Sequence, residues 1–292
     1  MNDSSSTATG ETTWEEILDR AKGRTTMLVG GPGSGKTRLA HWLVSRMASV
    51  PGLVALISTD VGQQSVGVPT CLGLALGEPR ERAAALWFVG DVAPTGNLLP
   101  MVVGTARLVE RARTAGAESI VIDTTGLIGV PLGCLLKYHK ILAAGVDFVV
   151  AIQRSSELEA MLGVLAGICP LIDRIRPAAE ARDRTPAERR AYREDRYRAC
   201  FRDADVLTLP LDRLIACGWA LDTGSRLPRG RIVGLLDENG FCLDLGLVED
   251  VGSGTLTVHT PWKRPEAVRR IQEGRISLDR HAEFREMESP AP

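Results

Sequence analysis

The chain has 292 residues, of which 44% are hydrophobic and 24% charged, and its formal net charge is −1. This composition is ordinary for a globular protein with a full core, and the near-zero net charge gives no general sign of nucleic-acid binding. The six cysteines show no metal-ligand or disulfide spacing, and no apolar run approaches the ~18 residues of a membrane-spanning helix. We expect a cytoplasmic protein without membrane association, whose residues 1–25 are a partly disordered tail.

Apolar runs and helical patterns alternate along residues 26–211. The runs that we predict as strands cover 26–30, 53–58, 86–89, 119–123, 147–152 and 205–209, and helical patterns lie near 38–49, 101–115, 132–144, 156–167 and 186–202. Apolar strands that alternate with helices predict an α/β fold, in which helices cover both faces of a mostly parallel sheet. Ligands of such sheets bind at the carboxyl ends of the strands, so functional residues should follow the apolar runs.

The first predicted strand runs into residues 30–37, which fit the P-loop pattern G-x-x-x-x-G-K-[ST]. Glycines let backbone N–H groups surround a polyphosphate, and the N-terminus of the following helix adds partial positive charge. In this pattern Lys36 reaches the β- and γ-phosphates, and the Thr37 hydroxyl holds Mg²⁺. We therefore predict a nucleoside triphosphate site, whose nucleotide-binding residues are Gly31, Pro32, Gly33, Ser34, Gly35, Lys36, Thr37 and Arg38.

Acidic residues end two later predicted strands. Asp60 should lie beside the P-loop, where it can accept a proton from an attacking hydroxyl or orient the water shell of a metal. Asp123 opens an Asp-x-x-Gly pattern that resembles a metal site, and Gly126 lets the backbone approach the γ-phosphate. We predict that Thr37, Asp60 and Asp123 hold Mg²⁺. A loop cap at Asp60 and an Asp-initiated turn at Asp123 are the structural alternatives.

Residues 182–202 are rich in arginine, and Pro186 stands where the first residue of a helix would. For most of these arginines a solvated helix with ion pairs is the simpler interpretation, and we expect Arg193 and Arg196 to be exposed. The functional interpretation is a lid that closes over the transferring phosphate, because a planar guanidinium bridges two phosphate oxygens. The arginines are Arg182, Arg184, Arg189, Arg190, Arg193, Arg196, Arg198 and Arg202.

The character of the sequence changes after residue 228. Residues 232–237 and 241–248 predict a hairpin with a tight Asn-Gly turn, residues 255–260 predict another strand, and residues 266–273 predict a short helix. We therefore divide the chain into three parts: the tail, a P-loop domain at 26–228 with its lid at about 182–202, and a small β-rich domain at 229–292.

Short stretches within residues 26–280 resemble the polynucleotide 5′-hydroxyl kinases of RNA processing. These stretches are 60–63, 66–69, 88–90, 93–97, 122–126, 184–201, 233–237 and 245–248. The Asp-x-Gly-Gln element at 60–63 and the spaced lid arginines are the specific parts, since many families share the P-loop. The resemblance implies that residues 26–228 are a kinase domain. It would transfer the γ-phosphate of ATP, or of another donor such as GTP, to the 5′-OH end of RNA or DNA.

The resemblance also implies a role for each matching residue. The implied catalytic residues are Lys36, Asp60, Arg184 and Arg189. Asp60 is similar to the general base of the family, the two arginines to its lid arginines, and Gln63 to a contact with the terminal nucleotide of the substrate. The turn at 94–97 is implied to line the nucleic-acid channel. The candidate substrate-binding residues are Gln63, Thr95, Asn97, Thr125 and Gly126.

The chain departs from the family pattern at named positions. Ser58 stands where an acidic residue is frequent, and Leu127 stands where a tryptophan often stacks on the substrate. About 25 residues precede the first predicted strand, in place of an N-terminal β domain. No Asn-Lys-x-Asp guanine motif is present, which favours ATP as the donor. The alternative class is a P-loop NTPase switch or assembly factor that senses the γ-phosphate through the Asp-x-x-Gly element. A small-molecule kinase is a weaker third option, and protein partners stay open.

Overall fold

The computed structural model describes residues 12–49, 52–77, 83–129, 131–169, 171–178, 182–210, 215–217, 227–252, 254–280 and 284–287. The strands of the P-loop part are β1 (Thr25–Gly30), β2 (Leu53–Thr59), β3 (Cys71–Leu76), β4 (Ala85–Phe88), β5 (Ala117–Thr124), β6 (Phe148–Ile152) and β7 (Leu171–Ile175). The helices are α1 (Trp14–Ala21), α2 (Lys36–Met47), α3 (Leu98–Thr114), α4 (Leu132–Ala144), α5 (Glu159–Leu165) and α6 (Pro186–Cys200). The C-terminal elements are β8 (Asp205–Pro210), β9 (Ile215–Cys217), β10 (Arg231–Leu236), β11 (Cys242–Gly252), β12 (Thr255–Thr260), η2 (Pro265–Ala267), β13 (Arg270–Asp279) and β14 (Arg285–Met287).

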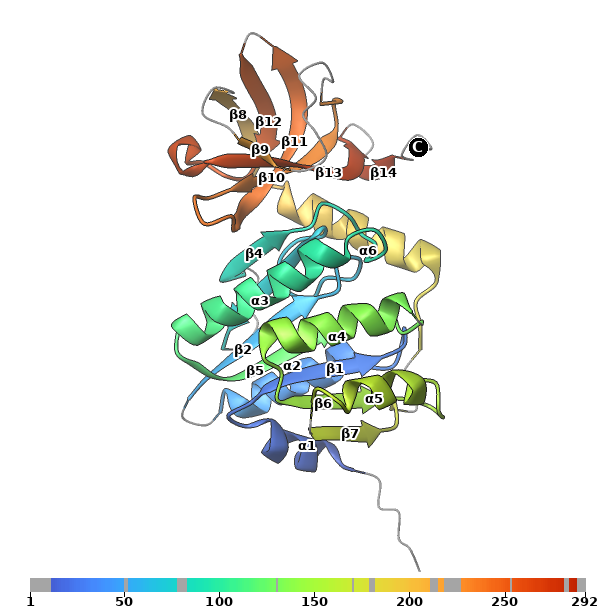
Figure 1. The fold of residues 1–292 in the computed structure, drawn as a ribbon. Helices are drawn as coiled ribbons and strands as arrows, with labels where there is room; N and C mark the ends of the chain where they lie inside the picture. Colours follow the sequence, from blue (N-terminus) through green and yellow to red (C-terminus); the bar gives the residue numbers. More distant parts are fainter. Residues whose placement is uncertain are drawn as a thin grey trace, which may run out of the picture.

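Parallel strands form the centre of the P-loop part, in the order β2-β5-β1-β6-β7. Helices α3, α4 and α5 cover one face of this sheet, and α2 lies on the other (Figure 1). The predicted α/β fold with helices on both faces is therefore confirmed. Because the strands are parallel, the ends of β1, β2 and β5 meet at one edge of the sheet. The P-loop, Asp60 and Asp123 lie together at this edge.

The outer strands differ from the sequence prediction. Strand β3, which the sequence analysis did not predict, pairs antiparallel with β2, and β4 pairs antiparallel with β3. The prediction of residues 205–209 as part of the alternating parallel sheet is wrong, because β8 pairs antiparallel with β12 of the C-terminal strands. An apolar run predicts a buried strand, but it does not specify which strand becomes its partner.

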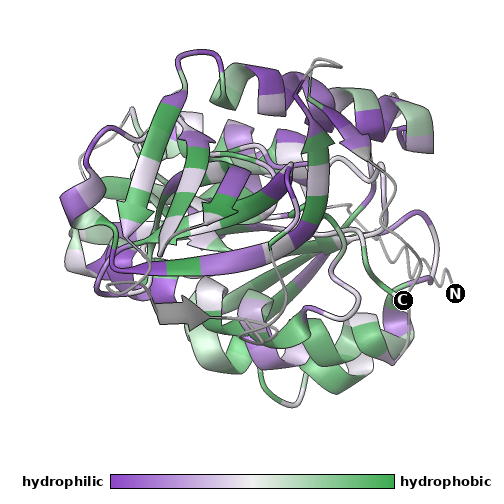
Figure 2. Cartoon of the chain, turned by 90° about the horizontal axis from the view of Figure 1, so that it is seen from above, coloured by the Kyte–Doolittle hydropathy of each residue, from purple (hydrophilic) through white to green (hydrophobic). Residues whose placement is uncertain are grey.

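Side chains of the central strands alternate between two apolar layers. Met27 and Val29 of β1 lie in the layer that α3, α4 and α5 cover, whereas Leu28 lies in the layer that α1 and α2 cover. All three side chains are fully buried, and each such burial contributes about 1.5–3 kcal/mol. Figure 2 shows hydrophobic residues running along the strands at the centre of the molecule. The sheet is therefore a rigid support for the loops at its edge.

Helix α1 replaces part of the predicted tail. Residues 1–11 lie outside the described part, but Trp14–Ala21 is helical. A capping box begins the helix: the Thr13 hydroxyl accepts from the backbone N–H of Glu16, and the Glu16 carboxylate accepts from that of Thr13. Ile17 and Ala21 are buried in the same cluster as residues of α2. The T-x-x-E pattern was the signal for this helix in the sequence.

The C-terminal strands continue the sheet rather than form a separate layer. The predicted hairpin is confirmed as β10 and β11, and Gly240 in its turn has a φ of +83°. Strand β11 pairs with β4 at Cys242 and Leu86, which joins the two parts. The helix predicted at 266–273 is wrong, because η2 is short and β13 begins at Arg270. Among the described residues, no helix has both the length and the apolar character needed to cross a membrane.

Candidate active site

A cleft of about 710 Å³ opens at the carboxyl ends of the central strands. Its walls come from the P-loop and the start of α2, the loops after β2 and β5, the ends of β6 and β7, and the segment from Arg182 to Arg193. Trp14 of α1 also lines it, a contribution that the sequence analysis missed. The cleft lies where ligands of parallel sheets bind, and it gathers segments that are distant in the chain.

Glycines shape the P-loop. Gly33 has a φ of +62° and Gly35 a φ of +89°, in the left-handed region that glycine adopts without steric cost. Gly35 is the N-cap of α2, and no described side chain forms a cap hydrogen bond there. The first N–H groups of a helix are donors without intrahelical partners, so this helix start suits an anionic phosphate.

Lys36 lies inside the P-loop and is buried. Its Nζ donates to the carbonyl oxygens of Gly30 at 2.9 Å and Gly31 at 2.7 Å. Burial lowers the pKa of Lys36, and the carboxylates of Asp123 and Asp60 act in the opposite direction. A bound polyphosphate would favour the charged amine in the same way as these carboxylates do.

Thr37 and Asp123 form a pair of oxygen donors. The Thr37 hydroxyl donates to Asp123 Oδ2 at 2.7 Å. Asp123 Oδ1 is buried and accepts no hydrogen bond from the residues described. Burial raises the pKa of Asp123 to about 6, opposed by the hydrogen bond from Thr37 and the charge of Lys36. A hydroxyl beside a carboxylate with an unused oxygen fits Mg²⁺, a hard cation that prefers oxygen ligands.

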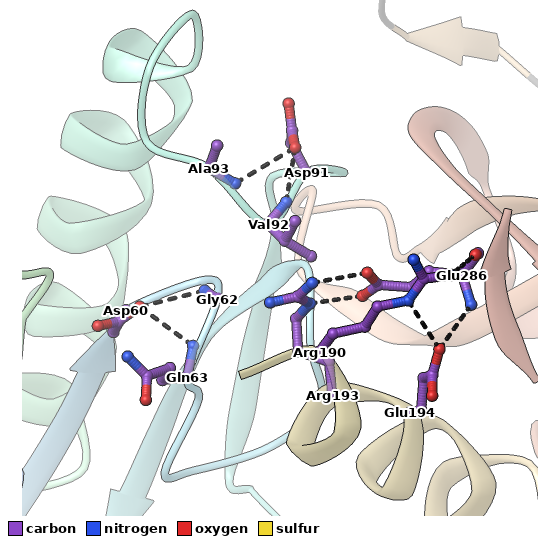
Figure 3. Close-up of polar contacts among 10 residues, drawn as sticks. All are labelled: Asp60, Gly62, Gln63, Asp91, Val92, Ala93, Arg190, Arg193, Glu194 and Glu286. Carbon is purple, nitrogen blue, oxygen red and sulfur yellow. Dashed lines mark hydrogen bonds and ion pairs between the residues drawn. The ribbon is translucent and has the colours of Figure 1, made fainter. Parts of the chain in front are cut away.

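Asp60 follows β2 and lines the cleft. Its Oδ1 accepts from the backbone N–H groups of Gly62 and Gln63, each at 3.1 Å (Figure 3). The loop cap that was the alternative interpretation is therefore present, and the residue faces the cleft as well. Oδ2 takes part in neither of these bonds. One carboxylate thus orders its own loop and presents an oxygen beside the P-loop.

The loop after β5 touches the P-loop and is held by α4. A Cβ on Gly126 would lie 2.8 Å from the backbone nitrogen of Pro32, so the close approach requires glycine. Lys137 Nζ donates to the carbonyl oxygen of Thr125 at 3.0 Å and lies 3.4 Å from its hydroxyl. The Lys137 side chain of α4 therefore holds the Asp-x-x-Gly loop in place, and Thr125 is itself buried.

The sequence analysis missed both buried lysines of α4. Lys137 and Lys140 are fully buried and lie on the same face as Leu136. Lys140 Nζ has no hydrogen-bond partner within the described ranges. Burial lowers its pKa to about 7, against the opposing charges of Asp60 and Asp123. Lysines on the apolar face of a predicted helix were the available signal, because unpaired lysine is rarely buried.

Arg184 links the lid segment to the loop after β2. Its Nη1 donates to Gln63 Oε1 at 3.0 Å, and its guanidinium lies 4.6 Å from the centre of the Tyr192 ring. The Tyr192 hydroxyl donates to the backbone oxygen of Gln64 at 2.8 Å. The sequence analysis did not single out Tyr192. The family resemblance gave separate roles to Arg184, as a lid arginine, and to Gln63, as a contact with the terminal nucleotide. The hydrogen bond joins these two residues.

Arg189 lies in the first turns of α6 and also lines the cleft. Its Nη1 donates to both carboxylate oxygens of Asp183, at 3.2 and 3.1 Å. A Cβ on Gly33 would lie 2.2 Å from the backbone nitrogen of Asp183, so the segment before α6 rests directly on the P-loop. Both predicted lid arginines therefore lie in the lining of the cleft that contains the P-loop.

Helix α6 is anchored to the C-terminal strands. Arg193 Nε and Nη2 donate to the two carboxylate oxygens of Glu286 at 2.5 and 2.6 Å, as Figure 3 shows. Arg190 donates to the Glu286 carbonyl oxygen, and Arg196 donates to that of Gly67. The prediction that Arg193 and Arg196 are exposed is therefore wrong. Helical spacing in the sequence does not show what packs against the helix.

The predicted channel turn at 94–97 contains two cleft residues, Pro94 and Thr95, and one supporting residue, Asn97. Asn97 is buried, and its Nδ2 donates to Asp91 Oδ2 at 2.9 Å and to the carbonyl oxygen of Ala93 at 3.0 Å. Asn97 therefore stabilises the turn, and the prediction that it binds substrate directly has no support from its position. Its amide is used within the protein.

The parallel sheet, the strand–loop–helix P-loop and the Thr37–Asp123 pair define a P-loop protein that binds a nucleoside triphosphate. Comparison with known families gives a narrower assignment. Residues 30–203 match the family described as mRNA cleavage and polyadenylation factor CLP1 P-loop, and the chain belongs to this family.

Curated relatives match the chain over most of its length. The polyribonucleotide 5′-hydroxyl-kinase of Thermococcus kodakarensis is 29% identical, with 92% of each chain covered. The polyribonucleotide 5′-hydroxyl-kinase of Pyrococcus furiosus is 26% identical, with 90% of each chain covered. A protein of the same name from Methanocaldococcus jannaschii is 26% identical, covering 91% of this chain and 90% of its own.

Solved structures agree on the fold. A chain from a Clp1p–Pcf11p complex superposes with a TM-score of 0.67 at 12% identity, covering 89% of this chain and 76% of that chain. A second structure, of an extended interface between Pcf11p and Clp1p, also gives 0.67, at 14% identity over 89% of this chain and 77% of that chain. At these identities the likeness concerns the architecture alone.

Proposed function

We propose that this chain is a polynucleotide 5′-hydroxyl kinase, which transfers the γ-phosphate of a nucleoside triphosphate to the 5′-OH end of RNA or DNA. The carrying observation is that Asp60, Gln63 and Arg184 meet at the P-loop cleft. They supply a proton acceptor, an amide for the acceptor strand and a cation for the phosphate. The names of the archaeal relatives support this reaction and favour RNA over DNA.

The proposed mechanism assigns one task to each residue. The 5′-oxygen attacks the γ-phosphorus and its proton passes to the Asp60 carboxylate, while the bond to the β,γ-bridging oxygen breaks and a nucleoside diphosphate leaves. Lys36 and the lid arginines Arg184 and Arg189 stabilise the negative charge on the phosphate oxygens. Lys137 keeps the Thr125 loop in place through its hydrogen bonds.

We also propose that the reaction uses Mg²⁺ and ATP. Thr37 and Asp123 would hold the metal, which would neutralise charge on the β- and γ-phosphate oxygens. Asp60, the third predicted ligand, acts in this proposal as the base. ATP is favoured over GTP because the chain contains no Asn-Lys-x-Asp motif. A cytoplasmic location belongs to the same proposal, and the five cysteines with described side chains are free.

The test uses ATP labelled in the γ-phosphate. Purified protein with Mg²⁺ should transfer label to 5′-OH RNA and DNA oligonucleotides, and it should not label the same oligonucleotides with a 5′-phosphate. Lys36→Ala should abolish transfer, because it removes the charge that reaches the β- and γ-phosphates. ATP hydrolysis that is indifferent to 5′-OH ends would contradict the kinase and favour an NTPase switch.

A further inference from the structure

The cleft has two ends, on either side of the P-loop. At one end lie Asp60 and the loop after β5, where phosphoryl transfer is proposed. At the other end, past β1 in the sheet order, the cleft is lined by Ile152 at the end of β6 and by residues 175–178 after β7. A triphosphate whose γ-phosphate lies near Asp60 extends away from that residue. The nucleoside therefore lies at the second end of the cleft.

Trp14 lines this second end, and α1 holds it in place. The helix is fixed by its capping box, by the buried side chains of Ile17 and Ala21, and by an ion pair between Arg20 and Asp173 of β7. Figure 1 shows α1 beside β7, at the side of the sheet away from the C-terminal strands. Trp14 is the first residue of the helix and is partly exposed.

The Trp14 indole packs against two side chains of α2. Its ring meets the Trp42 ring edge to face, with centroids 5.3 Å apart, and the Arg38 guanidinium lies 5.9 Å from its centre. Trp42 packs in the same helix pair but does not belong to the cleft lining. Trp14 therefore packs against α2 and also lines the cleft.

We propose that Trp14 is the stacking platform for the nucleobase of the donor triphosphate, opposite the segment with Arg176 and Pro177. This inference rests on the proposed function, which supplies the donor and its direction in the cleft. Every base has a π-face, so stacking on an aromatic ring gives affinity with little choice between bases. Loss of this ring is therefore expected to weaken the binding of ATP and of GTP by similar factors.

The experiment measures binding without any acceptor. Calorimetry compares ATP, GTP and inorganic tripolyphosphate, which has no base, on the wild type, Trp14→Ala, Trp14→Phe and the control Trp42→Phe. Trp14→Ala should weaken ATP and GTP about tenfold or more, and Trp14→Phe should retain most of the affinity. Tripolyphosphate should bind all four proteins alike. Parallel losses of ATP and tripolyphosphate affinity, or no loss, would overturn the proposal.

A second measurement does not depend on the alanine variant. ATP should quench tryptophan emission in the wild type and in Trp42→Phe, and this quenching should disappear in Trp14→Phe. Equal quenching in all three proteins would also overturn the stacking role. Trp14→Ala could weaken ATP and GTP but not tripolyphosphate, while no 5′-OH end is phosphorylated. That result would support the base site and contradict the proposed reaction. If transfer occurs without any base effect of Trp14, the proposed reaction stands and this inference fails.

Discussion

Asp60 combines two roles that a single substitution separates. Its Oδ1 accepts from the N–H groups of Gly62 and Gln63, a role that an asparagine oxygen also fills. An amide, however, does not accept the proton of a 5′-hydroxyl. Asp60→Asn should keep the loop and ATP binding but lower the transfer rate by ~10²–10⁴-fold, as for other general bases. Single-turnover transfer and calorimetry measure the two effects, and normal turnover would move the base role to another residue such as Asp123.

Lys140 makes stability depend on pH. Its pKa is about 7 in the folded protein because of burial, against an ordinary value near 10.5 in the unfolded chain. Between these values the unfolded state binds one more proton, so the free energy of unfolding rises with pH by about 1.4 kcal/mol per unit from this group. Below about pH 7 both states are protonated and the contribution is constant.

Lys140→Met should therefore stabilise the protein most at and below pH 7, and it should flatten the rise above pH 7. Urea unfolding at pH 7, 8 and 9 measures the difference between the two proteins. Titration of groups distant from Lys140 is common to both proteins and cancels in the difference. The pKa of Lys137 is lowered by burial and by the charge of Lys140, so it rises in the variant. Parallel stability curves for wild type and variant would show that Lys140 is charged in both states.

At the scale of elements, we propose that the segment before α6 and the first turns of this helix form a lid over the P-loop. Arg184→Ala or Arg189→Ala should lower kcat by ~10³-fold or more, because these cations act on the transferring phosphate. Arg198 is the matched control, since it pairs with Asp195 on the exposed side of the same helix. Single-turnover transfer compares the three variants. Equally mild effects of all three substitutions on the transfer rate would contradict the lid and favour the alternative interpretation, a solvated helix with ion pairs.

The position of α6 depends on the pair between Arg193 and Glu286. Their side chains are only 14% and 11% exposed, so removing one charge leaves the other largely desolvated. Glu286→Gln should cost about 1–3 kcal/mol of stability. Arg193→Met should cost less when Glu286 is already Gln, with a coupling of at least ~0.5 kcal/mol in a double-mutant cycle by urea unfolding. Additive costs would mean that the pair does not anchor the helix.

At the scale of the whole molecule, Phe88 connects the two parts. It is the last residue of β4, is 2% exposed, and lies against glycines of the C-terminal strands. A Cβ on Gly234 would lie 2.5 Å from Phe88 Cγ, and one on Gly274 would lie 3.1 Å from its Cζ. The absence of side chains at these glycines forms a socket for the ring, so the contact couples the folding of both parts.

Phe88→Ala should cost about 3–5 kcal/mol and split thermal unfolding into two transitions. Phe148→Ala is the matched control, because Phe148 is fully buried in β6 inside the P-loop part. It should cost a similar amount while leaving one transition. Differential scanning calorimetry distinguishes the two cases. A single transition in Phe88→Ala would mean that other contacts, such as the pairing of β4 with β11, are sufficient for the coupling.

The sequence by itself determined the parts whose chemistry lies within a short segment. The P-loop, the strand ending before Asp60, the Asp-x-x-Gly loop and the start of α6 at Pro186 are each specified by neighbouring residues. Their mutual position also follows, because the carboxyl ends of parallel strands meet at one edge. The α/β fold and the contact between Thr37 and Asp123 therefore agree with expectation, while metal binding by this pair stays a prediction.

Only the tertiary structure decided which distant residues become partners. The pairing of β8 with β12 and the anchor of Arg193 on Glu286 are not visible in any local pattern. Trp14 reaches the cleft only because α1 packs beside β7. The physical reason is that burial and pairing depend on what the fold places opposite a residue. Periodicity and spacing describe the residue's own element alone.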